Sequence, residues 1–428
     1  MTTLGKPVQV GNIFYEITGA NTVKVMPDRS SSPTSNSYKG DIEIPSTVTI
    51  DGKTYTVNEI GTRAFSSCYN LTSLKMPNTI VRIDSSAINS CYKLTTLELS
   101  GSVRVIENMG ISSLPLTKLT LNEGLDSLGY QAIAMLNSLP DTLNLPASLR
   151  AMAPGGVGFC HKLTAYSIPE SNKNFKTVDG VIFSKDGKTL WAFPCYKECP
   201  DGYTLPSGET ALSLTACRIL TACTVHLQLY HLRRSTPYAF YSSAKLYNIE
   251  RATSVRTIGT AGFGSCIRLT KIEFGYNLQR IDSAGLASVG SSLIKNSDGL
   301  PEHAVISLSG CRALKYIGKR AFTSGSVEQL DIPAAVDTIE NDAFVFASYL
   351  KRIDVASANP RFVSINGVLY DRDMTTLLCV PANYENQLFE FPKGVKHIGA
   401  NAFFNCRNMR EVVLPDDLES MGDEAFYY

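Results

Sequence analysis

Residues 60–83 read Ile-Gly-Thr-Arg-Ala-Phe-Ser-Ser-Cys-Tyr-Asn-Leu-Thr-Ser-Leu-Lys-Met-Pro-Asn-Thr-Ile-Val-Arg-Ile, and the same apolar pattern then begins again at Ile83. With Ala64 as a marker, equivalent positions recur along the chain at a nearly constant interval, as in a repeat architecture. They are Ala64, Ala87, Gly110, Ala132, Gly156, Ala216, Ala239, Gly262, Gly285, Ala321, Ala343, Ala402 and Ala425. A unit this short cannot bury its own apolar face, so neighbouring units must stack to share one core. The sequence therefore predicts a solenoid.

Within each unit, the segment Leu71-x-x-Leu74-x-Met76 predicts a short strand in a parallel sheet. Ala64-Phe65 is expected on a short helical or irregular turn on the opposite side. A proline recurs directly after the strand, where a missing ladder hydrogen bond costs nothing. These prolines are Pro77, Pro146, Pro169, Pro333 and Pro415.

Two longer intervals between markers contain matching inserts. Phe175 to Pro194 and, in the second half of the chain, Phe362 to Pro381 are alternating apolar runs around Asp-Gly or Asn-Gly, which is a hairpin signal. A third segment, from Gly11 to Pro27, resembles these two inserts more weakly. The expected domains are an N-terminal β-hairpin cap at residues 1–55 and a solenoid at residues 56–428, with hairpin inserts at about 172–200 and 358–386.

The repeat pattern Ile-Gly-x-x-Ala-Phe-x-x-Cys-x-x-Leu-x-x-Leu-x-Leu-Pro resembles the BspA-type leucine-rich-repeat family of bacterial surface proteins. The resemblance covers roughly residues 55 to 428. It implies a right-handed leucine-rich-repeat solenoid, β-rich, with a parallel concave sheet. It also implies export, exposure at the cell surface and, in some members, attachment to host extracellular proteins. It implies no catalytic residue, because the motif consists of core positions.

Two stretches depart from the repeat pattern. Residues 211–237 lack a clear strand motif, and residues 286–311 contain the polar insertion 291–299. Each is either a functional protrusion or a degenerate repeat, and surface loops that carry function are often polar and glycine-containing, as the second stretch is.

Charge and hydropathy exclude several classes of function. Forty basic and thirty-nine acidic residues give a net charge of +1, so we expect no nucleic acid partner. The chain has no apolar run long enough for a transmembrane helix, and its first residues do not resemble a signal peptide. A signal removed from a longer protein and a cytoplasmic origin are both compatible with this start.

Cysteine and histidine spacing predicts packing and not chemistry. Cys68, Cys91, Cys160, Cys266 and Cys406 all lie four residues after a marker, which predicts a buried ladder, with Cys311 as a displaced member. Cys195 and Cys199 lie outside this phase and are either a local disulfide or two thiols. The five histidines fall in unrelated repeat positions. We therefore expect no catalytic residue, no metal site and no cofactor.

The candidate binding surface is the outward row of the parallel sheet, because the residue between two inward-pointing apolar positions of a strand faces solvent. In register, this row contains Lys75, Glu98, Thr120, Asn144, Ser167, Glu250, Glu273, Asp331, Asp354 and Val413. Its acidic members Glu98, Glu250, Glu273, Asp331 and Asp354 form the predicted site. They serve either solubility or the docking of a basic protein segment or a cation.

The leading functional hypothesis is a non-enzymatic, secreted or surface-anchored protein that binds a protein or glycan ligand, with adhesion to host components as one form. The alternatives are a structural spacer or oligomerising cell-envelope component without a specific ligand, and an enzyme assembled at the inserts. The last residues, Glu424 to Tyr428, begin a new repeat. Their exposed core positions make an oligomer through the C-terminal end one expected arrangement.

Overall fold

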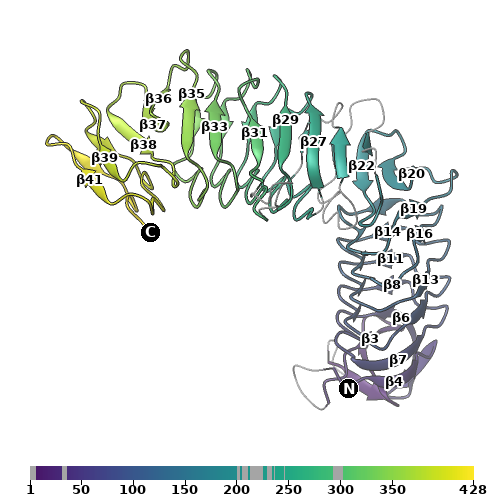
Figure 1. The fold of residues 1–428 in the computed structure, drawn as a ribbon. Coiled ribbons are helices and arrows are strands. Elements are labelled where there is room, and N and C mark those ends of the chain that lie inside the picture. The colour runs from purple at the N-terminus through teal and green to yellow at the C-terminus, as the bar shows by residue number, and fades with distance from the viewer. Residues whose placement is uncertain are drawn as a thin grey trace. The chain divides into compact units, whose positions relative to one another are not determined.

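The computed structural model describes residues 6–30, 36–199, 203–204, 211–212, 225–228, 234–235, 237–244, 246–292 and 302–428. It is a β-solenoid of about 14 turns, built on parallel strands with no helix in these residues, and so confirms the predicted solenoid (Figure 1). The chain divides into two compact units, unit 1 (residues 1–197) and unit 2 (residues 198–428). Each unit is described by itself below.

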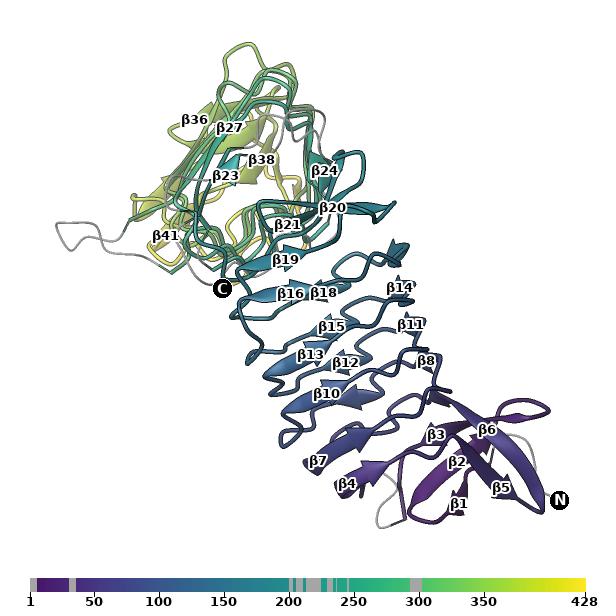
Figure 2. The ribbon, with the colours of Figure 1, turned by 90° about the vertical axis from the view of Figure 1, so that its right-hand side faces the viewer.

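The solenoid turns of unit 1 have three sides, and short strands on each side form a parallel row (Figure 2). The long row contains β4 (Lys39–Glu43), β7 (Asn70–Lys75), β10 (Thr96–Glu98), β13 (Lys118–Thr120), β16 (Thr142–Asn144) and β19 (Ala165–Ser167). The Ile-Gly row contains β6 (Lys53–Ile60), β8 (Arg82–Ile83), β11 (Val105–Ile106), β14 (Ser127–Leu128) and β17 (Ala151–Met152). The third row contains β9 (Ile88–Asn89), β12 (Ile111–Ser112), β15 (Ile133–Ala134) and β18 (Val157–Gly158).

Apolar residues occupy equivalent positions in successive turns and pack on one another. Ile106 pairs with Ile83 on one side of the strand and with Leu128 on the other, and all three are almost fully buried. Burying an aliphatic side chain of this size contributes about 1.5–3 kcal/mol. Because every solenoid turn repeats the arrangement, the stability of the unit comes from stacking between neighbours.

Two corners of most turns have left-handed backbone, mainly at residues that are not glycine. Arg63 (φ 58°) and Ser67 (φ 61°) occupy these corners in one turn, and Ser86 (φ 54°) and Ser90 (φ 56°) occupy them in the next. Such a conformation costs a non-glycine residue about 1–2 kcal/mol. Hydrogen bonds between turns offset that cost, as when the Ser67 amide donates to the Asn89 carbonyl at 2.8 Å.

The N-terminal strands close the first end of unit 1. β1 (Val8–Val10), β2 (Ile13–Ile17) and β3 (Thr22–Met26) form an antiparallel meander. β3 then pairs in parallel with β6, which also pairs in antiparallel fashion with β5 (Thr47–Ile50). The edge of the Ile-Gly row is therefore covered by sheet and not left open to solvent.

Unit 2 repeats the long row and the Ile-Gly row. Its long row contains β23 (Tyr203–Thr204), β25 (Val225–Gln228), β27 (Leu246–Ala252), β29 (Lys271–Phe274), β31 (Val305–Ser307), β33 (Gln329–Ile332), β35 (Arg352–Val355), β39 (Leu388–Glu390) and β41 (Glu411–Val413). Its Ile-Gly row contains β26 (Arg234–Ser235), β28 (Thr257–Ile258), β30 (Arg280–Ile281), β32 (Tyr316–Ile317), β34 (Thr338–Ile339), β38 (Thr376–Cys379), β40 (His397–Ile398) and β42 (Ser420–Met421). In the described residues, its third side consists of irregular turns, with phenylalanines stacked inside. The ring centroids of Phe240 and Phe263 lie 4.8 Å apart, and the two rings are nearly parallel.

The two inserts have the same structure. β20 (Phe175–Val178) and β21 (Val181–Ser184) form an antiparallel hairpin in unit 1, and β22 (Thr189–Ala192) follows them. β36 (Phe362–Ile365), β37 (Val368–Asp371) and β38 repeat this arrangement in unit 2. Positive φ at both turn residues, 53° at Asn366 and 81° at Gly367, is typical of a type I′ hairpin turn.

The tip of each hairpin is joined to the long row. The Ile353 amide donates to the Gly367 carbonyl at 2.9 Å, and the Tyr166 amide makes the same bond to Gly180 at 2.8 Å. A Cβ atom at Gly367 would lie 2.6 Å from the Cβ of Arg352. Glycine is therefore required by both the turn conformation and the close approach of the two backbones.

Candidate functional site

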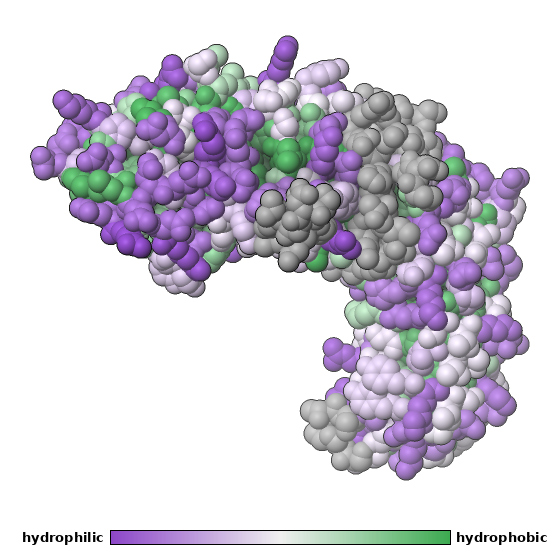
Figure 3. Space-filling model, in the orientation of Figure 1, coloured by the Kyte–Doolittle hydropathy of each residue, from purple (hydrophilic) through white to green (hydrophobic). Residues whose placement is uncertain are grey.

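The candidate site is the outward face of the long row of unit 2. Strand alternation buries Ile272, Leu330 and Ile353 beneath this row and turns the residues on either side of each toward solvent. Two columns of outward residues result, and the second of them contains the predicted acidic residues. Figure 3 shows this face as largely hydrophilic, with an apolar area over β31, where Val305 is 64% exposed.

Asp331 and Asp354 lie side by side, because β33 and β35 pair in parallel with these two residues in register. Arg352 donates two hydrogen bonds of 2.7 Å to the Asp354 carboxylate, one from Nε to Oδ2 and one from Nη2 to Oδ1. That hydrogen-bonded pairing with Asp354 raises the pKa of the Arg352 guanidinium. Gln329 bridges the two carboxylates, at 3.0 Å from Asp354 and 3.3 Å from Asp331.

A cavity of about 790 Å³ opens beside these two carboxylates. Asp331 and Asp354 lie at its polar side together with Arg312. The rest of the lining is mainly small and apolar, and consists of Ser309, Ile332, Pro333, Ala334, Ala335, Val355 and Ala356. A concave, mainly apolar surface with a few polar groups is the usual form of a ligand site.

The other predicted residues are distributed along the solenoid. Glu273 lies on β29 and pairs with Lys271, two residues earlier on the same face, at 2.8 Å. Glu250 lies on β27, and its side chain falls outside the described part of the structure. Glu98 belongs to unit 1, where it is exposed on β10 in register with Thr120. The structure therefore brings together two of the five acidic residues, Asp331 and Asp354, while the polar insertion 291–299 lies mostly outside the described residues.

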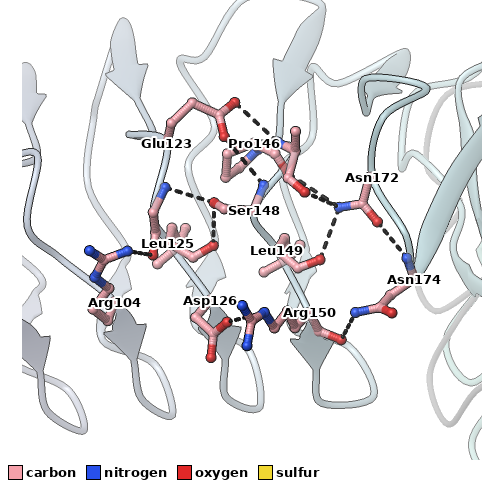
Figure 4. A network of polar contacts seen from close by, with 12 residues as sticks. Arg104, Glu123, Leu125, Asp126, Pro146, Ser148, Leu149, Arg150, Asn172 and Asn174 are labelled. Carbon is pink, nitrogen blue, oxygen red and sulfur yellow. Dashed lines mark hydrogen bonds and ion pairs between the residues drawn. The ribbon is translucent and has the colours of Figure 1, made fainter.

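Two buried asparagines were missed by the sequence analysis. Asn172 is 1% exposed, and its amide nitrogen donates to the Leu149 carbonyl at 2.9 Å (Figure 4). Its oxygen accepts the amides of Asn174 and Phe175. Asn359, at the equivalent position of unit 2, makes the same bonds at the start of the second insert. Comparing the two inserts position by position could have found this pair, which joins each insert to the preceding solenoid turn.

The cysteine ladder is a packing feature. Cys68, Cys91, Cys160 and Cys266 are at most 1% exposed, and burial raises the pKa of Cys160 and of Cys266 to about 12. The buried Cys195 also belongs beside this ladder, because its thiol hydrogen-bonds the backbone of Phe159 and Cys160. The raised pKa keeps the Cys160 and Cys266 thiols protonated, and protonated thiols are poor nucleophiles and poor metal ligands.

The expected place of Cys311 in this ladder was wrong. Cys311 follows the long-row strand β31 and precedes β32 of the Ile-Gly row, whereas a ladder cysteine precedes a long-row strand, as Cys68 precedes β7. Its carbonyl accepts the amide of Leu314, three residues before Ile317, at 3.0 Å. The Pro333 carbonyl makes the same bond to Val336 one turn later. Cys311 therefore occupies the corner where other turns have proline. The segment from Ile306 to Ile317 is two residues longer than that from Leu330 to Ile339, which obscured the register.

Histidines and acidic residues do not gather into a site in the described residues. His303 contacts Glu328 at 3.4 Å, and His397 lies 2.8 Å from the Ser420 hydroxyl, each in its own part of unit 2. No group of three or more potential metal ligands occurs among the residues that were placed. In the same residues, no helix is long and apolar enough to span a membrane.

Comparison with known proteins identifies similar sequences and folds. A family model described as the BspA type leucine rich repeat region matches in six copies, over residues 37–185, 233–344, 285–366 and 382–428. The crystal structure of the pneumococcal vaccine antigen PcpA is 18% identical, covers 99% of this chain and 100% of its own, and gives a TM-score of 0.57. The crystal structure of a leucine-rich repeat protein from Eubacterium ventriosum is 15% identical, covers 97% of this chain and 92% of its own, and gives a TM-score of 0.50. No functionally curated protein matches the sequence.

Proposed function

Because the chain belongs to the BspA-type leucine-rich-repeat family, we propose that it is a non-enzymatic binding protein, exported and displayed at a bacterial cell surface. Its ligand is an extracellular protein, which docks a basic segment on the long row of unit 2. The family and its leucine-rich-repeat fold support a scaffold for protein interaction. One structural neighbour is a vaccine antigen, which is consistent with display outside the cell.

The observation that carries this proposal is the cavity beside Asp331 and Asp354. Its apolar lining suits the methylene stem of a lysine or arginine, and the carboxylates suit the charged end. Asp354 is already paired with Arg352, whereas Asp331 has no ion pair in the described residues. Asp331 is therefore the carboxylate that pairs with the incoming basic side chain, and Gln329 holds it beside Asp354.

The test begins with the purified chain immobilised against a panel of purified host extracellular-matrix proteins. Each ligand found is then measured with the double variant Glu273→Gln/Asp331→Asn. We expect its affinity to fall about tenfold or more, which corresponds to the loss of one desolvated charge pair. Affinity for the unaltered chain should also fall as salt is added, since screening weakens charge pairing.

The matched control is Glu385→Gln/Asp416→Asn, which removes two exposed charges of the same unit outside the cavity and outside the long-row strands. It should bind like the unaltered chain. Equal binding by the Glu273/Asp331 double variant would remove the acidic face from the proposal. A panel without any ligand would favour the structural spacer.

A further inference from the structure

A separate surface of unit 1 carries a column of side chains at one equivalent position of successive turns, and the column begins with two tyrosines. The residue directly after the cysteine position recurs once in each turn as Tyr69, Tyr92, Pro115, Asn137 and His161. Tyr69 is 54% exposed and Tyr92 is 62% exposed. Their rings stack with centroids 5.4 Å apart and an angle of 11° between the planes. Two large aromatic rings are thus held face to face in solvent, where burial does not account for them.

Beyond Tyr92 the column becomes smaller and leaves an opening of about 410 Å³. Tyr92 lines one end of this opening and His161 the other, with Pro115 and Asn137 between them. Solenoid turns are spaced by about 4.8 Å, so three steps separate Tyr92 from His161 by about 14 Å. We call this opening the Tyr92 slot. Its volume lies within the usual range for small-ligand sites, about 300–1,000 Å³.

The lining of the Tyr92 slot combines the apolar side chains of Leu114, Pro115 and Met135 with several polar groups. It contains the hydroxyls of Ser113 and Ser138, the amide of Asn137 and the imidazole of His161, and no lysine, arginine, aspartate or glutamate. Hydroxyl and amide groups both donate and accept hydrogen bonds, so they match a partner whose groups do the same. A charged segment would lose hydration here without gaining an ion pair.

Several contacts already order the slot. The Oδ1 atom of Asn137 accepts the His161 backbone amide at 3.2 Å, which fixes the orientation of the side-chain amide. The Ser113 hydroxyl donates to the Met135 sulfur at 3.5 Å. Thioether sulfur is a weak acceptor, so a ligand hydroxyl can replace it at little cost. The stack with Tyr69 holds the Tyr92 ring in place before any ligand arrives, which reduces the entropy lost on binding.

We propose that the Tyr92 slot binds a neutral saccharide. One pyranose ring packs its C–H face against Tyr92, and its hydroxyls exchange hydrogen bonds with Ser113, Asn137 and Ser138. A saccharide hydroxyl both donates and accepts, as the lining requires. The backbone carbonyls of a proline-rich peptide only accept, so such a peptide would leave the acceptors of the slot unmatched.

The test is calorimetric titration of the full chain with neutral hexasaccharides of the cello, malto, chito and manno series. We expect millimolar or tighter binding to at least one of them, weakened about tenfold or more by Tyr92→Ala and retained by Tyr92→Phe. The control Tyr276→Ala removes a tyrosine that is 64% exposed in unit 2 and should change nothing. Thermal unfolding of each variant establishes that the solenoid is intact.

Absence of binding to all four series overturns the proposal, as does binding that Tyr92→Ala leaves unchanged. Tyr92-dependent binding of decaproline without saccharide binding assigns the slot to a peptide and also overturns it. The double variant Glu273→Gln/Asp331→Asn should bind the saccharide normally. The saccharide site and the acidic face can therefore fail independently.

Discussion

Replacement of Asn359 by alanine tests how the inserts are anchored in the solenoid. Asn359 is 1% exposed and donates to the carbonyls of Pro333 at 3.0 Å and Val336 at 2.9 Å. Its oxygen accepts the amides of Arg361 and Phe362, each at 2.8 Å. One side chain thus joins the second insert to the preceding solenoid turn.

The size of the effect depends on which groups lose their only partner. The Pro333 carbonyl also accepts the Val336 amide, and Arg361 is exposed to water, so both remain satisfied in the variant. The Val336 carbonyl and the Phe362 amide are left without the asparagine. Each unsatisfied buried group costs about 1–3 kcal/mol, which gives a loss of about 2–6 kcal/mol.

Urea unfolding followed by circular dichroism measures this loss, and hydrogen exchange locates it. Protection should fall first in β36 to β38 and the neighbouring turns, since a solenoid transmits stability between neighbours. The control Asn386→Ala removes an exposed asparagine from the same unit and should cost less than about 0.5 kcal/mol. A loss below about 1 kcal/mol for Asn359→Ala would refute the anchoring role.

The hairpin turn, the buried thiols and the C-terminal end each give a further prediction. Gly367→Ala should lower the unfolding free energy by about 1–3 kcal/mol, because the new Cβ would lie 2.6 Å from the Cβ of Arg352 in a left-handed turn. The control Gly101→Ala, which has open space around it, should have little effect in the same denaturation assay. Burial raises the pKa of Cys160 and Cys266 from 9.0 to about 12, so both thiols should resist iodoacetamide at pH 8 until urea is added. Because these folded-state pKa values lie above the ordinary one, the contribution of the two thiols to stability is complete below pH 9 and is lost as the pH rises toward 12. Rapid labelling of the folded chain, or an unfolding free energy that stays constant between pH 9 and 12, would contradict the burial argument. If the C-terminal end mediates self-association, light scattering should show a dimer that Phe426→Asp converts to a monomer, since Phe426 is 43% exposed, and a monomeric unaltered chain would argue against it.

Much of the fold follows from the period of the sequence. The spacing of apolar residues predicted parallel stacking, and prolines such as Pro77 and Pro333 do lie within two residues of the end of a long-row strand. The cysteines could be assigned to packing because a shared repeat position places them at the equivalent interior position of their turns. The type I′ turn at Asn366-Gly367 likewise has a short-range sequence signal.

Other features had no periodic signal. The third row of unit 1 consists of two-residue strands such as Ile111–Ser112, which are too short to show alternation. The left-handed corners are occupied mostly by residues other than glycine, serine and arginine among them, so glycine did not mark them. Asn172 and Asn359 act as single residues whose partners lie in the preceding turn, and only the three-dimensional stacking brings those carbonyls to them.

The candidate site was predicted in its location more than in its chemistry. The sequence prediction used only one outward residue per strand, and it therefore gave Glu273 and Asp354 as acidic residues without their basic partners. The residue two positions earlier points to the same side, and Lys271 and Arg352 are there to pair with them. The cavity beside Asp331 depends on small residues from neighbouring turns, Ala335 and Ala356 among them, and no single repeat contains that information.

Carboxyl footprinting is the most direct test of the proposed binding face. Carbodiimide and glycine ethyl ester would label the chain with and without a bound matrix protein, and mass spectrometry would compare Asp331 with the exposed Asp416. The proposed docking predicts that the ligand protects Asp331 several-fold and leaves Asp416 unchanged. Equal labelling of Asp331 in the free and bound chain would contradict docking on the long row of unit 2.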